Sequence, residues 1–187
     1  MSERSVNLDY LNQHSEEFEE DLYMELLACI HQQLGKLTSP TLKELETSLK
    51  RISNIYELVQ PFITDPDQFS YGRNVIYLNE NLEVIVINLP PHVETAIHDH
   101  GNSIGCAMVV EGKLLNSIYR NNENQTERAA AYFVQKGDCL FAPQGLIHKM
   151  SNLQDERMIS LHVYSPPLLN MSSYQEQAAS DILPDVV

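Results

Sequence analysis

The stretch GDCLFAPQGLIHKMSN, residues 137–152, decides the fold. Gly137, Pro143 and Gly145 interrupt two short apolar runs, and His148 and Asn152 follow at defined intervals. Glycine and proline in such positions are typical of tight turns between strands. The stretch therefore predicts two short β-strands joined by a turn, with one histidine on the second strand.

A second stretch, His98-Asp99-His100, begins about 40 residues upstream of the first. On a strand, residues two apart point to the same face, so the two imidazoles can share one metal ion. An isolated His-x-His is more often a pair of exposed histidines in a loop. Gly112, placed to close a hairpin, and the pattern at 137–152 favour the metal interpretation. Imidazole ligands suit iron, zinc, copper or nickel.

Residues 137–152 match the second motif of the cupin superfamily, which is Gly, five residues, Pro, one, Gly, two, His, three, Asn. His98-Asp99-His100 with Gly112 resembles the first motif. The resemblance implies a jelly-roll β-barrel with His98, His100 and His148 at one end.

Most metal cupins place a glutamate four or five residues after the second histidine. Ile104 and Gly105 occupy those places in this chain, so the resemblance implies a site of three histidines without a carboxylate ligand.

The rest of the chain predicts a mainly β, α+β fold in which helices precede strands. Phe18, Leu22, Leu26, Ile30 and Leu34 recur every fourth residue, as on one face of a helix. Ser39 as N-cap and Pro40 at the first position predict a second helix, and a third is expected to carry Ile55, Leu58, Val59 and Phe62. The expected strands are 74–78, 82–89, 104–110, 113–119, 130–134, 139–142, 147–152 and 158–164.

We expect one cupin domain over residues 1–187, with helices in 1–66, the barrel in 71–167 and a tail in 168–187. The net charge of −14 makes nucleic acid an unfavourable partner and also disfavours an anionic membrane surface. No window reaches the roughly 18 apolar residues of a membrane-spanning helix. Three scattered cysteines fit free thiols in a reducing compartment, so a cytoplasmic location is expected. A monomer is also expected, although no residue pattern sets the oligomeric state.

Two further motifs resemble the cysteine dioxygenase family. Tyr71-Gly72-Arg73-Asn74 matches the Tyr-x-Arg-Asn that precedes the first metal motif in that family. The stretch SLHVYSPP, residues 160–167, matches its Ser-x-His-x-Tyr-Ser-Pro-Pro. The resemblance covers Tyr71 to Pro167, and it implies oxidation of L-cysteine to cysteine sulfinic acid with O2 at one Fe(2+) per chain.

The family roles are carried over to the matching positions. His98, His100 and His148 resemble the iron ligands. Arg73 resembles the residue that holds the substrate carboxylate, with Tyr71 as its partner, and a guanidinium suits such a bidentate contact. Tyr164 resembles the active-site phenol, with His162 and Ser160 as a relay behind it. Alternation on a strand places these last three residues on one face.

Animal members of the family carry a cysteine five residues after the second metal histidine, and it is crosslinked to the active-site tyrosine. Gly105 stands at that position, as is common in bacterial relatives. Cys106 follows, and on a regular strand it points to the opposite face. We therefore expect no thioether between Cys106 and Tyr164, although a β-bulge would change the register.

Alternatives remain open at this level. The sister activity on 3-mercaptopropionate uses a similar scaffold but tends to have glutamine where Arg73 stands, which favours cysteine. A non-catalytic metal- or ligand-binding cupin would need neither Arg73 nor Tyr164. A zinc-dependent isomerase or decarboxylase is distinguished by metal analysis, because ligand spacing does not select iron over zinc.

Overall fold

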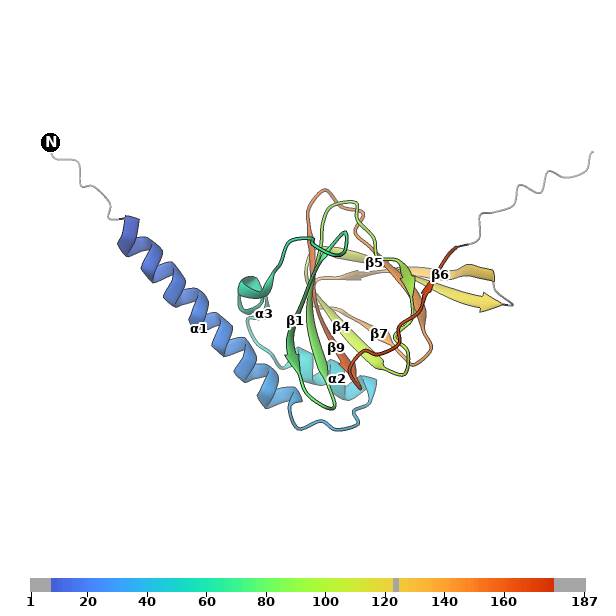
Figure 1. The fold of residues 1–187 in the computed structure, drawn as a ribbon, viewed down its shortest axis with the longest axis horizontal. Coiled ribbons are helices and arrows are strands. Elements are labelled where there is room, and N and C mark those ends of the chain that lie inside the picture. Colours follow the sequence, from blue (N-terminus) through green and yellow to red (C-terminus); the bar gives the residue numbers. More distant parts are fainter. Residues whose placement is uncertain (1–7, 123–124, 177–187) are drawn as a thin grey trace, which may run out of the picture.

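The computed structural model describes residues 8–122 and 125–176. Two five-stranded sheets face each other, and every pair of named strands is antiparallel (Figure 1). The first sheet has the order β1-β2-β9-β4-β7, with bounds Gly72–Leu78, Glu83–Leu89, Met158–Ser165, Ile104–Glu111 and Cys139–Ala142. The second has the order β10-β3-β8-β5-β6, with bounds Ser173–Tyr174, Ile97–His98, Ile147–Ser151, Lys113–Asn122 and Gln125–Gln135.

This arrangement confirms the expected mainly β fold of the cupin type with helices before the strands. All eight expected strands are present, and their limits agree closely except for β6. The alternation of β6 is hidden by polar residues near its start, and the strand begins at Gln125 instead of Ala130. Two strands were not expected, β3 and β10, which are two residues long and pair with each other.

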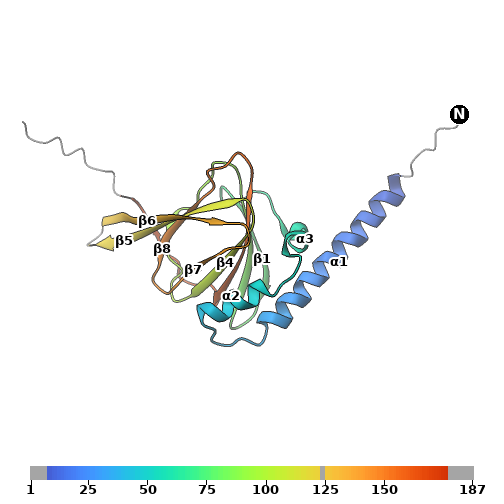
Figure 2. The same cartoon turned by 180° about the vertical axis from the view of Figure 1, so that it is seen from behind.

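Helix α1 spans Leu8–Leu34 and lies beside the first sheet, near β1 (Figures 1 and 2). The fourth-residue repeat buries Leu26, Ile30 and Leu34 completely, as the pattern predicts, and Leu22 is partly buried. The side chain of Phe18 lies outside the described part of the structure.

Helix α2 spans Leu42–Lys50, and its start corrects the expected cap. Thr41, not Ser39, is the N-cap: its hydroxyl accepts from the Glu44 N–H at 3.3 Å, and the Glu44 carboxylate accepts from the Thr41 N–H at 2.8 Å. This reciprocal capping box satisfies two backbone donors, and Ser39 has no glutamate three residues on to form one.

The expected third helix is two short pieces, α3 at Ile55–Leu58 and the 3-10 helix η1 at Gln60–Phe62. Pro61 lies within the second piece. Because proline has no N–H to donate, it does not continue an α-helical turn from the preceding residues.

The first sheet is packed on both faces. Its outer face joins the helices in one apolar core that includes Val84, Val86, Leu161 and Val163. Its inner face meets the second sheet through a separate apolar cluster that includes Leu89, Leu114 and Met158. Met150 of this cluster also borders the pocket that contains the polar residues of the site.

Within the described residues, no helix has the length and apolar character needed to cross a membrane.

Candidate metal centre

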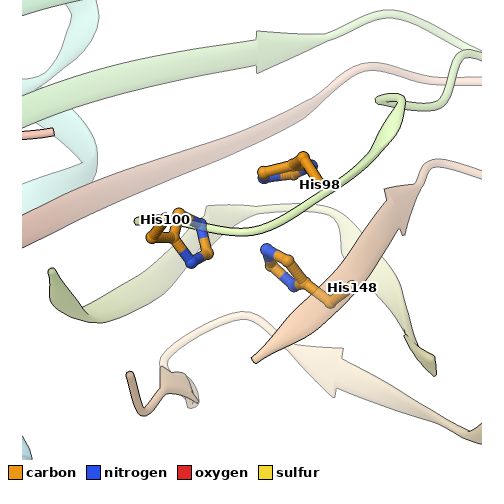
Figure 3. A group of neighbouring side chains, drawn as sticks. All are labelled: His98, His100 and His148. Atoms are coloured by element: carbon orange, nitrogen blue, oxygen red, sulfur yellow. The ribbon is translucent and has the colours of Figure 1, made fainter. Parts of the chain in front are cut away.

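Three histidines, two on neighbouring strands and one just after a strand, point toward one another (Figure 3). His98 ends β3 and lies opposite His148 of β8, while His100 follows β3 just before the turn at Gly101. Their ring centroids lie 4.7–5.1 Å apart, and one nitrogen from each ring lies within 4.8 Å of the others. The structure thus brings together the three residues that the motifs single out.

Hydrogen bonds fix the orientation of two of these rings. The Ala96 carbonyl accepts from His98 Nδ1 at 2.8 Å, and the side-chain oxygen of Asn116 accepts from His148 Nδ1 at 2.7 Å. The amide of Asn116 is itself oriented, since its nitrogen donates to Tyr132 Oη at 2.9 Å. With Nδ1 protonated, each Nε2 keeps its lone pair for a metal ion.

The histidine ring nitrogens that face one another are available to bind a metal ion. His148 Nε2 and both ring nitrogens of His100 are buried without a hydrogen-bond partner among residues 8–122 and 125–176. Burial lowers the pKa of all three histidines, to about 4 for His100, where repulsion from His98 adds to the effect. Buried polar atoms normally find partners, so three neutral imidazoles left open toward one point fit a divalent metal ion. Among the described residues, no carboxylate or thiolate joins this group.

Asp99, between the two motif histidines, holds the chain after the barrel and does not join the metal group. Its carboxylate accepts from the backbone N–H of Gly101 and Ser172 at 2.9 and 3.0 Å, and from Tyr174 Oη at 2.6 Å. These contacts attach β10 to β3. The first part of the expected tail therefore lies against the site, and residues 177–187 lie outside the described part of the structure.

The expected relay comes from the opposite sheet, on β9. Ser160 Oγ and His162 Nε2 lie 2.8 Å apart, and His162 Nδ1 and Tyr164 Oη lie 3.0 Å apart. The Tyr164 ring packs on His100 with centroids 4.9 Å apart, so the phenol borders the metal group. Burial lowers the pKa of His162 to about 3 and raises that of Tyr164, which keeps the imidazole and the phenol neutral.

Two pockets beside the metal group share lining residues; the smaller one, which also includes His162 and Tyr164, is called the inner part of the cavity and the larger one the outer part. The inner part, about 40 Å³, is lined by Arg73, His98, His162 and Tyr164 together with Tyr71, Ile85, Ile87, Thr95, Met150, Leu168 and Met171. The outer part, about 550 Å³, shares Tyr71, Arg73, Thr95, His98 and Met171 and is also lined by Phe69, Ser70, Ala96 and Ser173. Arg73 and Tyr71 thus line both parts of the cavity.

The guanidinium of Arg73 is already paired with a buried acid. Arg73 Nη2 donates to Glu83 Oε1 at 2.9 Å, and Glu83 Oε2 accepts from the backbone N–H of Leu168 at 2.9 Å. Tyr71 stacks on Phe69 with ring centroids 5.2 Å apart, and burial raises its pKa although Arg73 opposes this shift.

The register at Gly105 and Cys106 agrees with the prediction. Gly105 lies opposite Tyr164, where a Cβ atom would lie 2.6 Å from two ring carbons, while Cys106 lies in the core beneath the helices. The irregularity between β4 and β9 falls at Val109/Glu111, away from this pair. Contact with Cys139 and burial raise the pKa of the Cys106 thiol. The absence of a thioether stays a prediction.

Sequence reasoning missed several residues of the site: Glu83, Thr95, Asn116, Leu168 and Met171. Glu83 could have been found, because alternation from Ile85 and Ile87 places it on the cavity face. Asn116 is a polar residue in a strand, and its partner His148 lies 32 residues further along the chain. No local sequence pattern therefore predicts this contact.

Comparisons with known proteins agree with this geometry. A family model described as cysteine dioxygenase type I matches residues 41–177. The human protein named cysteine dioxygenase type 1 is 20% identical over 141 residues, covering 67% of this chain and 70% of the relative. The Danio rerio protein of the same name is 23% identical over 118 residues, covering 59% of each chain.

A solved structure from Klebsiella pneumoniae, described as an uncharacterized conserved protein with a double-stranded β-helix domain, has the same fold. Its TM-score is 0.51 at 21% identity, covering 67% of this chain and 98% of that one. The family match extends over well more than half of the chain. The chain belongs to the cysteine dioxygenase type I family.

Proposed function

We propose that this protein is a thiol dioxygenase that binds Fe(2+), one per chain, at His98, His100 and His148 and oxidises L-cysteine to cysteine sulfinic acid. The observation that carries the proposal is the group of three inward-facing imidazoles next to a cavity that contains Arg73 and Tyr164. Membership of the cysteine dioxygenase type I family supports the same reaction.

The proposed reaction is balanced without a further reductant. Both atoms of O2 bond to the substrate sulfur, which loses four electrons as the O2 gains four, and the thiol becomes a sulfinic acid. When bound, Fe(2+) supplies the centre at which thiolate and O2 react, and its charge favours the thiolate over the thiol. The protein contributes the geometry and the electrostatic field.

Arg73 is the residue proposed to hold the substrate carboxylate. Arg73 lines both parts of the cavity together with His98, so its guanidinium is proposed to bind one end of a substrate whose sulfur lies near His98. A planar fork of N–H donors suits a carboxylate and fixes its direction, which a lysine does not do. Holding the reacting atoms in this way lowers the barrier by reducing the entropy lost on reaction.

Tyr164 is proposed to donate a hydrogen bond into the cavity. If Ser160 donates to His162 Nε2, then His162 Nδ1 carries the proton and donates to Tyr164 Oη. The phenolic hydrogen is then available to oxygen or carboxylate groups of the reactants. The raised pKa of Tyr164 keeps that hydrogen in place at neutral pH.

The apolar wall of the inner cavity is proposed to exclude water from the reacting sulfur. Ile85, Ile87, Met150 and Leu168 line the inner cavity together with the polar residues. A dry site strengthens the hydrogen bonds of Arg73 and Tyr164 and prevents side reactions of the reactants with water.

A thiol panel tests this function. Iron-loaded protein is given L-cysteine, cysteamine or 3-mercaptopropionate, and O2 uptake and sulfinate formation are measured. We expect the highest kcat/KM with L-cysteine. A higher kcat/KM with 3-mercaptopropionate would identify that thiol as the substrate instead. Stoichiometric zinc with no iron-dependent turnover would favour a zinc cupin, and no turnover with any thiol at full iron occupancy would refute the enzymatic function.

Arg73→Ala tests the substrate contact separately. The KM for L-cysteine should rise far more than the KM for cysteamine, which has no carboxylate. Equal changes for both thiols would refute the role of Arg73.

The organisation and setting of the chain remain proposals. One core joins the helices to the first sheet, which supports a single cupin domain over residues 1–187. Free thiols at Cys29, Cys106 and Cys139 support a reducing, cytoplasmic location. The monomeric state is to be measured by sedimentation, and no nucleic-acid partner is proposed.

A further inference from the structure

A buried carboxylate lies directly behind the proposed substrate-binding arginine. Glu83 begins β2, opposite Tyr164 of β9, and is 7% exposed. Each of its carboxylate oxygens has one partner, Arg73 Nη2 on one side and the Leu168 N–H on the other. Because both oxygens are held, the negative charge stays at a fixed position beside the cavity.

A second arginine–glutamate pair in the molecule has a different geometry. Arg157 binds Glu111 through two nitrogens, Nε at 3.1 Å and Nη2 at 3.2 Å, one to each carboxylate oxygen. Glu83 contacts Arg73 through one terminal nitrogen only. Its single contact leaves the remaining edge of the Arg73 fork, with its N–H donors, available to a second anion.

Arg73 lines the cavity, and the edge of its guanidinium that Glu83 leaves free is the one proposed to face a substrate carboxylate. A substrate carboxylate on that edge shares one cation with Glu83, and two carboxylates on one guanidinium repel each other. Such repulsion in a partly buried site lowers affinity for the incoming anion. The same repulsion does not act on a thiol that has no carboxylate.

We propose that Glu83 is a specificity-determining residue that weakens the hold of Arg73 on a substrate carboxylate and so sets how strongly the site prefers carboxylate-bearing thiols. The proposal rests on the thiol-binding function proposed above. Glu83 acts through Arg73 and does not itself touch the substrate.

Binding to cobalt-loaded protein without oxygen tests the proposal apart from turnover. The dissociation constants of L-cysteine, 3-mercaptopropionate and cysteamine are measured from the thiolate-to-cobalt absorption band. We expect Glu83→Gln, which keeps the shape and removes the charge, to bind the two carboxylate-bearing thiols roughly tenfold more tightly. Cysteamine should not bind more tightly than it does to the unmodified protein.

Two control variants separate charge from shape. Glu83→Asp keeps the charge and should not tighten binding of any of the three thiols. Glu111→Gln removes a similar charge from the Arg157 pair, away from the cavity, and should leave all three dissociation constants unchanged. Weaker binding of all three thiols to both Glu83 variants would show a merely structural role and overturn the proposal.

A double variant gives a second, independent readout if Glu83→Gln does not fold. Arg73→Gln/Glu83→Gln removes both charges and should bind L-cysteine more tightly than Arg73→Gln alone, because only the single variant keeps the unpaired Glu83 charge. Equal affinities would overturn the proposal. If the unmodified protein bound no thiol, the function proposed above would fail, and the specificity role would fail with it. Unchanged selectivity in variants that do bind thiols would refute the role of Glu83 alone.

Discussion

Strand β9 has two faces that are equally buried and chemically opposite. Ile159, Leu161 and Val163 point into the apolar core beneath the helices. Ser160, His162 and Tyr164 alternate with them and point between the two sheets, where they form a chain of hydrogen bonds. Burial by itself therefore does not distinguish a residue that stabilises the fold from one that serves the site.

The difference lies in how each face compensates the loss of water. The apolar face gains free energy by leaving water, whereas every polar group on the other face needs a partner. The relay side chains satisfy one another. His148 Nε2 and both ring nitrogens of His100 lack hydrogen-bond partners within the described residues, and a metal ion would complete this face.

Loss of a metal ligand should have the largest effect. His148→Ala removes one of three ligands, so we expect stoichiometric metal binding and all metal-dependent activity to disappear while the metal-free protein still folds. Metal analysis and a thermal melt measure the two properties. Full metal occupancy in this variant would show that His148 is not a ligand.

A change on the apolar face of β9 should lower the stability of the fold and leave metal binding intact. Leu161 is fully buried, and Leu161→Ala should lower the free energy of unfolding by about 2–5 kcal/mol because it leaves a cavity. Urea unfolding measures this loss. Metal occupancy per folded molecule should stay at the level of the unmodified protein, and its loss would show that the two faces are not independent.

An intermediate effect is expected at Asn116, which orients His148 without reaching the metal. Asn116→Ala removes the acceptor for His148 Nδ1 and should weaken metal binding roughly 10–100-fold. Competition with a chelator measures this affinity. Tyr132→Phe removes only the hydroxyl that orients the Asn116 amide, so it should weaken metal binding less than Asn116→Ala does. A larger loss of affinity in Tyr132→Phe than in Asn116→Ala would contradict this chain of contacts.

The smallest effect concerns the dependence of stability on pH. The pKa of His162 is lowered to about 3 by burial and by repulsion from His100, against 6.5 as its ordinary value. On acidification the unfolded chain takes up this proton first, so His162 destabilises the fold progressively from pH 6.5 down toward 3. The slope from one such group is at most about 1.4 kcal/mol per pH unit.

Urea unfolding of the metal-free protein at pH 7, 6 and 5 measures this slope. His162→Gln should make it shallower by the contribution of one proton. His92→Gln, which changes an exposed histidine on the surface, serves as the matched control. A slope that does not respond to His162→Gln would show that this side chain is not held neutral in the fold.

The sequence predicts most of the strands and the metal group because these features have local signals. Alternation along 158–165 and the spacing of glycine, proline and histidine at 137–152 place the residues without knowledge of their distant neighbours. The sequence misplaces the start of α2 because Ser39 and Thr41, two residues apart, both suit an N-cap, and only the contact with Glu44 selects Thr41.

Contacts between distant segments were not predictable in the same way. Strand β10 has two residues, and its position depends on Asp99, which lies 73–75 residues from its partners Ser172 and Tyr174. The pairing of Arg73 with Glu83 needs the register of β1 and β2, which is irregular between Val75 and Tyr77. Such partners are set by tertiary structure, which no short pattern encodes.

In the proposed function, the three-histidine site directs both atoms of O2 to the sulfur of a small thiol. Iron-loaded protein is supplied with L-cysteine under isotopically labelled O2, and the product is analysed by mass spectrometry. The expected product is cysteine sulfinic acid that carries two labelled oxygen atoms. Product with at most one labelled oxygen atom, or no O2 consumption at full iron occupancy, would contradict it.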